Sequence, residues 1–153
     1  MTYLLDVNAL VALALRNHQR HSVMHAFMTA QQRLGWATCA FTQAGFVRVA
    51  SQNHTLGANP KSGMSSVFNP RLAASALAQN TGNPHHSYLA IDFDYSAVLS
   101  ACTGGIVGHR QITDAWLLTL AIRKRLQLLS FDTGLRGLLA TDAERSQHLM
   151  ILQ

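Results

Sequence analysis

Short apolar runs alternate with helical patterns along most of this chain, and this alternation limits the fold more than any other feature. Strands are predicted where the runs are short and β-prone, at residues 2–5, 36–40, 88–91, 126–131 and 149–152. Segments of helical periodicity separate them. The pattern is typical of a three-layer α/β/α fold with a central, mainly parallel sheet of four or five strands.

Residues that commonly cap helices stand before most of the helical segments. We predict five N-caps: Asn8, Ser22, Thr42, Asn69 and Thr113. The helices that they begin are expected to end near residues 17, 34, 51, 80 and 126, respectively. Asp94 is the predicted cap of a shorter helix that ends at Cys102. Residues 53–69 are rich in Asn, Gly, Ser and Pro and are predicted to form a surface loop.

Composition narrows the class of protein. The length of 153 residues predicts one domain spanning 1–153. The hydrophobic content of 48% favours a globular protein, and the net charge of +5 favours a polyanionic partner. Cys39 and Cys102 show no paired spacing, which fits a reducing cytoplasm. No stretch approaches the roughly 18 apolar residues of a membrane span. We therefore expect a cytoplasmic protein without a membrane anchor.

Only seven acidic residues occur, and three of them are expected at one edge of the sheet. Asp6 and Asp132 each follow an apolar strand, and Asp114 opens a helix after a connection that returns to the same edge. Taken singly, each has a structural explanation: a strand end, a turn residue and an acid favoured by a helix dipole. Together they would repel one another, and a divalent cation such as Mg²⁺ or Mn²⁺ would remove that cost and could activate water against a phosphodiester.

Four segments resemble, in order, the conserved blocks of PIN-domain ribonucleases of the VapC toxin family. They are Leu4-Leu5-Asp6-Val7-Asn8, Gly45-Phe46-Val47-Arg48-Val49, Thr113-Asp114-Ala115-Trp116-Leu117 and Ser130-Phe131-Asp132-Thr133-Gly134-Leu135. The resemblance implies a PIN fold and an Mg²⁺-dependent endoribonuclease, with Mn²⁺ as an alternative ion. It also implies the toxin of a type II toxin–antitoxin pair, a homodimer and a VapB-type antitoxin as partner.

Site residues follow from the resemblance position by position. Asp6 and Asp114 match the metal-binding aspartates, and Asp132 matches the later active-site aspartate. Asn8 and Thr113 match the polar residues that support them. Arg48 is expected to approach substrate phosphate or an active-site Asp, with an ordinary surface arginine as the alternative.

Gln43 departs from the family pattern, which commonly has an acidic residue just before the Gly-Phe-Val-Arg block. A glutamine can offer a carbonyl oxygen or hold a water, but it brings no charge and cannot act as a base. We therefore expect three carboxylates in place of four and hypothesise an active enzyme with a weaker metal site. Asp92 is a less favoured further acid near this edge.

Three functions remain open at this stage. The first is hydrolysis of RNA, and we expect a tRNA or another structured RNA with unpaired bases, since an A-form duplex hides its sequence. The second is a catalytically weakened PIN module that binds RNA or a partner protein without cleavage, which Gln43 alone favours. The third and remotest is a small-molecule phosphatase. The sequence lacks zinc-finger spacing, a dinucleotide fingerprint and a serine-hydrolase elbow.

Overall fold

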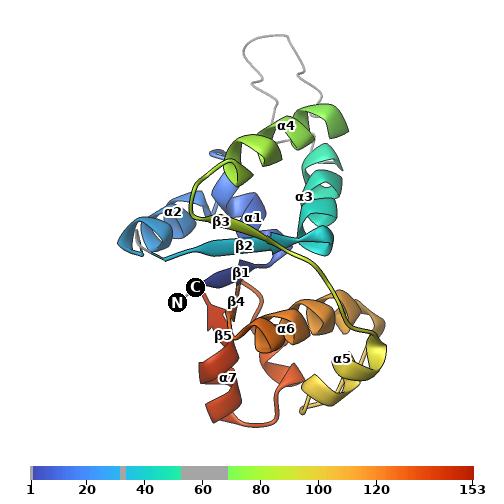
Figure 1. Cartoon of the computed structure of the whole chain (residues 1–153). Coiled ribbons are helices and arrows are strands. Elements are labelled where there is room, and N and C mark those ends of the chain that lie inside the picture. Colours follow the sequence, from blue (N-terminus) through green and yellow to red (C-terminus); the bar gives the residue numbers. More distant parts are fainter. Residues whose placement is uncertain (1, 32–33, 53–68) are drawn as a thin grey trace.

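A computed structural model describes residues 2–31, 34–52 and 69–153, and a parallel sheet lies at the centre of this part of the chain (Figure 1). Its strand order is β3-β2-β1-β4-β5, and every neighbouring pair is parallel. The strands are β1 (Tyr3–Leu5), β2 (Trp36–Cys39), β3 (His86–Leu89), β4 (Gln127–Ser130) and β5 (Leu149–Ile151). The prediction of a mainly parallel sheet of four or five strands is confirmed, with five strands that are all parallel. Most of the predicted loop 53–69 lies outside the described residues.

Helices cover both faces of the sheet (Figure 1). One layer contains α1 (Val7–Ala14), α2 (His21–Ala30), α3 (Ala40–Gln52) and α4 (Pro70–Thr81). The other contains α5 (Tyr95–Ala101), α6 (Ile112–Lys124) and α7 (Asp142–His148), with the short 3₁₀ helices η1 (His109–Gln111) and η2 (Thr133–Leu138). The three-layer α/β/α prediction is therefore confirmed.

Alternating side chains of β1 divide the core into two parts. Tyr3 and Leu5 pack with α1 and α3, while Leu4 packs with α6 and η2 on the opposite face. Both faces of β1 and β4 are therefore buried, and their near-continuous apolar runs fit central parallel strands. β3 lies at the edge of the sheet, where its residues are exposed or half-buried.

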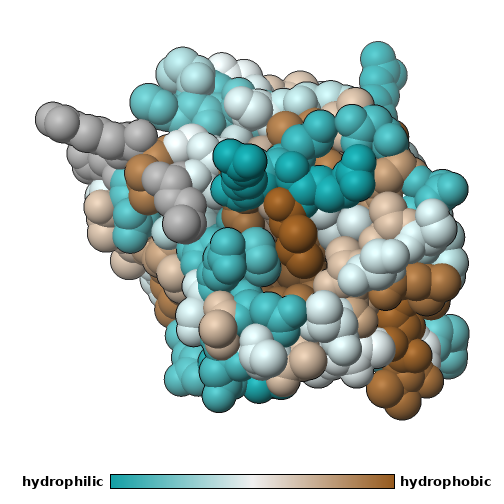
Figure 2. All heavy atoms as spheres, turned by 60° about the horizontal axis from the view of Figure 1, so that its bottom comes forward, coloured by the Kyte–Doolittle hydropathy of each residue, from teal (hydrophilic) through white to brown (hydrophobic). Residues whose placement is uncertain are grey.

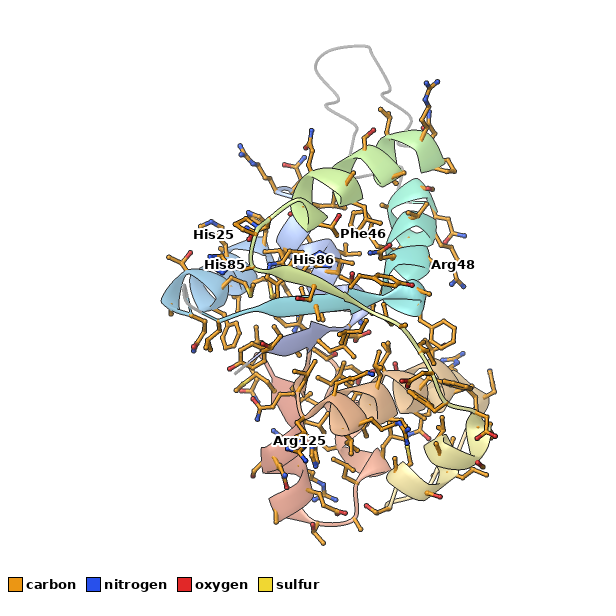
Figure 3. The ribbon with its side chains drawn as sticks, viewed as in Figure 1. His25, Phe46, Arg48, His85, His86 and Arg125 are labelled. Carbon is orange, nitrogen blue, oxygen red and sulfur yellow. The ribbon has the colours of Figure 1, made fainter. Side chains whose placement is uncertain are left out.

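A close backbone approach sets the distance between α1 and α3. Gly45 of α3 faces Val7 of α1, and a Cβ at Gly45 would lie 2.5 Å from Val7 Cγ2. Any larger residue would require the Val7 side chain or the two helices to shift. Phe46, the next residue, is fully buried and points from α3 into the interior, whereas Arg48 points outward (Figure 3).

Several predicted helix starts are wrong by two or three residues. Asp6, and not Asn8, is the N-cap of α1, because its carboxylate already accepts a hydrogen bond from Val7 N at 2.6 Å. Gln111 precedes α6, so Thr113 lies within its first turn. The 3₁₀ turn of η1 leads directly into α6 and leaves no position for a cap at Thr113.

Two further caps differ in the same way. Arg20 precedes α2, since a turn closed by His21 N and His18 O carries the chain into the helix before Ser22 is reached. Thr42 lies inside α3, where its Oγ1 accepts from Cys39 N at 2.9 Å. The caps at Asn69 and Asp94 are confirmed by their bonds to Leu72 N and Ser96 N.

The sequence patterns predict no helix at the position of α7 (Asp142–His148). Thr141 and Glu144 form a capping box, in which Glu144 N donates to Thr141 Oγ1 and Thr141 N donates to Glu144 Oε2. A short polar helix has little apolar periodicity and is stabilised mainly by its cap. No helix within residues 2–31, 34–52 and 69–153 has the length and apolarity needed to cross a bilayer.

Candidate active site

Asp6 is the most enclosed carboxylate of the described chain, with a relative exposure of 6%. β1 ends at Leu5, and Asp6 N donates to Leu129 O at 2.9 Å, which continues the pairing with β4 by one residue. One carboxylate oxygen accepts from Val7 N at 2.6 Å. The other accepts from Ser130 Oγ at 2.7 Å. The side chain is therefore held in one orientation at the carboxyl edge of the sheet.

Ser130 joins two of the three acids. This fully buried residue ends β4, next to Asp6 across the strand pair. Its hydroxyl donates to Asp6 Oδ2, and its oxygen accepts from Asp132 N at 3.0 Å. Asp132 then caps η2, with Oδ1 accepting from Gly134 N at 2.7 Å. The buried hydroxyl of Ser130 thus connects the Asp6 carboxylate with the Asp132 backbone.

Asp114 completes the acidic edge from α6. Burial is the main cause that raises the pKa of Asp114, and the nearby charges of Asp6 and Asp132 add to it, so that the pKa reaches about 6. Burial also raises the pKa of Asp6, with Asp132 adding a smaller contribution and the bonds from Ser130 and Val7 N opposing it. The three aspartates therefore lie close enough to repel one another, as the sequence predicts for this edge.

The acids do not by themselves form a complete metal cage. Among residues 2–31, 34–52 and 69–153, no group of three or more His, Cys, Asp or Glu side chains has a metal-binding arrangement. Mg²⁺ commonly uses only one or two protein carboxylates and completes its shell with water and substrate phosphate. Carboxylates whose mutual repulsion already raises a pKa match that donor set, and Asp6 and Asp114 are the groups that could hold such an ion.

Gln43 belongs to a different network. Its Nε2 donates to Thr38 Oγ1 at 2.9 Å, and Thr38 Oγ1 lies 2.8 Å from His86 Nε2. Thr38 Oγ1 accepts from Gln43, and its own hydroxyl proton is available to His86 Nε2 when the proton of the neutral ring is on Nδ1. Burial lowers the pKa of His86, and a bond with the Thr81 backbone opposes that shift. The amide is therefore tied to a half-buried, uncharged chain from β2 to β3.

The remaining predicted residues occupy less enclosed positions. Asn8 and Thr113 are exposed, on the first turns of α1 and α6. Arg48 is exposed on the outer side of α3 (Figure 3) and lines an apolar groove with Gln43 and Tyr88. Asp92 pairs with Lys124 at 3.3 Å, which gives this acid a structural partner away from the three aspartates.

Ser130 and Thr38 are the polar residues that sequence reasoning missed. Each is fully buried near the end of a predicted strand, at a position where an apolar residue is usual. A polar residue in an otherwise apolar strand is a usable signal, because a buried hydroxyl needs a partner.

Two ribonucleases resemble this chain in sequence. No family model matches the chain. Ribonuclease VapC38 of Mycobacterium tuberculosis H37Rv is 44% identical over 133 residues, covering 86% of this chain and 85% of the relative. Ribonuclease VapC44 of the same strain is 34% identical over 158 residues, covering 99% of this chain and 100% of the relative.

A solved structure supports the fold independently. The crystal structure of VapBC2 from Rickettsia felis, bound to a DNA fragment from their promoter, aligns with a TM-score of 0.58 at 13% identity. The alignment covers 91% of this chain and 96% of that chain.

Proposed function

The chain belongs to the VapC family of ribonucleases, and from that premise we propose that it hydrolyses RNA phosphodiester bonds at the edge formed by Asp6, Asp114 and Asp132. One observation supports this assignment above the others. Burial raises the pKa of Asp114 to about 6, with the nearby charges of Asp6 and Asp132 adding to the shift. A chain under no functional constraint would not be expected to keep such repulsion.

Asp6 and Asp114 would hold Mg²⁺, or Mn²⁺ in its place. A bound ion of this kind supplies charge neutralisation at the phosphate and lowers the pKa of water. Ser130 fixes the Asp6 carboxylate through the 2.7 Å bond to Oδ2, so Asp6 needs no reorientation to bind a cation. Preorganisation of this sort reduces the cost of reaching the reactive arrangement.

Asp132 is assigned to orient the attacking water and accept its proton. Its Oδ1 is engaged by Gly134 N, and the residue is exposed to solvent, which leaves Oδ2 as the acceptor. Attack by external water on the phosphorus, with the 3′-oxygen as the leaving group, gives a 5′-phosphate and a 3′-hydroxyl. The substrate we expect is a tRNA or another structured RNA with accessible unpaired bases.

The partners follow from the family. We expect a VapB-type antitoxin that neutralises the ribonuclease, in a cytoplasmic toxin–antitoxin pair. We also expect a homodimer, and the second helical layer offers apolar surface for one. Leu99 and Val107 are 58% and 93% exposed, and Figure 2 shows apolar surface at the side of the molecule where Figure 1 places α5. Light scattering on the purified protein measures the oligomeric state.

The test is cleavage of labelled RNA by purified protein with Mg²⁺ or Mn²⁺, and with EDTA as the metal-free control. Asp6→Asn and Asp114→Asn should each lower the rate at least about a hundredfold, since each removes a charge from the reacting edge. Asp92→Asn is the matched control, because Asp92 is exposed and paired with Lys124. Equal loss in all three variants would refute the assignment.

A catalytically weakened module is the second function to consider. Gln43 favours it, since the amide brings no charge and is engaged by Thr38. Metal-independent RNA binding without cleavage in the same experiment would favour the module. Cleavage that EDTA abolishes would favour the enzyme.

A further inference from the structure

A hollow of about 330 Å³ opens beside the proposed catalytic acid Asp132. Its wall combines residues from the first turn of α1, the α1–α2 turn and the end of β4: Asn8, His18, Gln19, Arg20, Phe131 and Asp132. The volume lies within the range of small-molecule sites. Its lining includes both a carboxylate, Asp132, and a guanidinium, Arg20.

Arg20 is held over the face of Phe131, with its guanidinium carbon 4.8 Å from the ring centroid. Phe131 is half-buried and packs against the core on the α1 side of the sheet, which makes the ring a fixed support. Within the described ranges the ion pairs are Lys124–Asp92 and Arg145–Asp142. Arg20 therefore presents a positioned cation with no carboxylate partner in that part of the chain.

The turn that carries Arg20 is fixed by its own hydrogen bonds. Arg20 N donates to His18 Nδ1 at 3.1 Å, and His21 N donates to His18 O at 2.9 Å. His21 Nδ1 lies 2.7 Å from Ala12 O and ties the turn to α1. Because His18 Nδ1 accepts, the proton of the neutral ring is on Nε2, where it can be donated to a ligand.

We propose that this hollow binds the RNA nucleotide adjacent to the scissile bond, with its phosphate on Arg20 and its sugar or base beside the amides of Asn8 and Gln19. The proposal rests on the ribonuclease function proposed above. A guanidinium fork matches a phosphate, and an uncharged histidine N–H adds a second donor. Arg20 covers the Phe131 face, so the subsite recognises the backbone through charge and does not stack a base on that ring.

The first measurement is the binding of fluorescein-labelled, random-sequence single-stranded RNA decamers by anisotropy. The protein carries Asp114→Asn so that the probe stays intact. Adding Arg20→Ala should weaken binding about tenfold, the size of one charged hydrogen-bonded contact. The slope of the logarithm of the binding constant against the logarithm of the salt concentration should fall in magnitude by about 0.7. This is the change expected when one phosphate contact to a single strand is lost. Arg16→Ala, an exposed arginine close by that does not line this hollow, is the matched control.

The second measurement is steady-state cleavage by the otherwise unaltered protein. Arg20→Ala should raise KM about tenfold and leave kcat within about threefold, and Arg20→Lys should recover part of the loss, because it restores the charge without the fork. Thermal melting confirms that each variant is folded. The subsite alone is refuted if the parent binds and cleaves RNA while Arg20→Ala behaves like Arg16→Ala, or if the loss lies in kcat. Failure of the parent to bind or cleave RNA refutes both proposals together.

Discussion

Two hydrogen-bonded networks lie at neighbouring strands of the same sheet, and they differ in charge. Between β1 and β4, Ser130 links Asp6 to Asp132, and Asp114 adds a third acid whose pKa is raised to about 6. Between β2 and β3, Gln43, Thr38 and His86 form a chain in which donors and acceptors match. In the second network the hydrogen-bonding groups pair with one another. In the first, the carboxylates repel one another unless a cation binds or a carboxylate is protonated.

This difference separates a functional site from a structural one. A half-buried polar chain with matched partners stabilises the packing of β2 against β3 and α3. An acidic edge with a raised pKa lowers the stability of the metal-free protein and gains from a bound cation. We therefore expect substitutions at the acidic edge to alter activity, and substitutions in the neutral chain to alter stability without comparable loss of activity.

Ser130→Ala should give the largest effect on stability. It removes the donor to Asp6 and the acceptor for Asp132 N, and it leaves a carboxylate oxygen buried without a partner. The free energy of unfolding should fall by about 2–3 kcal/mol, and cleavage should drop with it. Urea denaturation measures the first quantity and RNA cleavage the second.

Thr38→Val is the control for that variant, because it removes a fully buried hydroxyl from the neutral chain and keeps the shape of the side chain. It should cost about 1–2 kcal/mol of stability and leave the cleavage rate of the folded protein unchanged. The comparison between the networks breaks down if Thr38→Val lowers cleavage as much as Ser130→Ala does.

The stability of the metal-free protein should depend on the charge of Asp114. Its pKa rises from 3.8 to about 6 on folding, so the folded state holds the proton more tightly than the unfolded state between these values. Ionisation therefore destabilises the fold as pH rises from about 4 to about 6. The carboxyl is partly solvated, so we expect about 1 kcal/mol from it, or about 2–4 °C in Tm.

Asp114→Asn measures that contribution directly by thermal melting in EDTA. At pH 7.5 the variant should melt higher than the parent, and near pH 4 the two should converge. A variant that melts lower than the parent at pH 7.5 would show that the carboxylate is not under repulsion.

Gln43→Glu should give the smallest effect on metal binding. The new charge would lie in the neutral chain, so we expect about threefold tighter Mg²⁺ binding through a solvent-screened interaction. The Thr38 hydroxyl would turn toward the carboxylate, and the pKa of His86, followed by NMR, should rise. A hundredfold gain would make residue 43 a direct ligand. No change in metal affinity or cleavage rate would contradict the hypothesis that Gln43 weakens the site.

The sequence predicts the sheet and its acidic edge because these depend on simple patterns. Apolar strands alternating with helices require parallel pairing, and parallel pairing brings Asp6 and Asp132 to one edge. The caps predicted at Asn8 and Thr113 are wrong for different reasons: the 3₁₀ turn of η1 leads directly into α6 before Thr113, and another side chain already caps α1 before Asn8. That side chain is Asp6.

Contacts between distant residues were beyond the sequence reading. The Ser130–Asp6 bond joins residues 124 positions apart, and the Thr38–His86 contact joins residues 48 apart. Only strand order and register bring these pairs together. The Arg20–Phe131 contact depends on the same kind of information, because the α1–α2 turn must fold over the end of β4.

The most direct test of the account is the effect of Mg²⁺ on the melting temperature at pH 7.5, for the parent and for Asp114→Asn. If the acidic edge holds a cation that relieves repulsion, saturating Mg²⁺ should raise the Tm of the parent by several degrees over its value in EDTA. The same ion should leave the Tm of Asp114→Asn nearly unchanged. An equal shift in both proteins, or none in either, would contradict the claim that these carboxylates form the metal site.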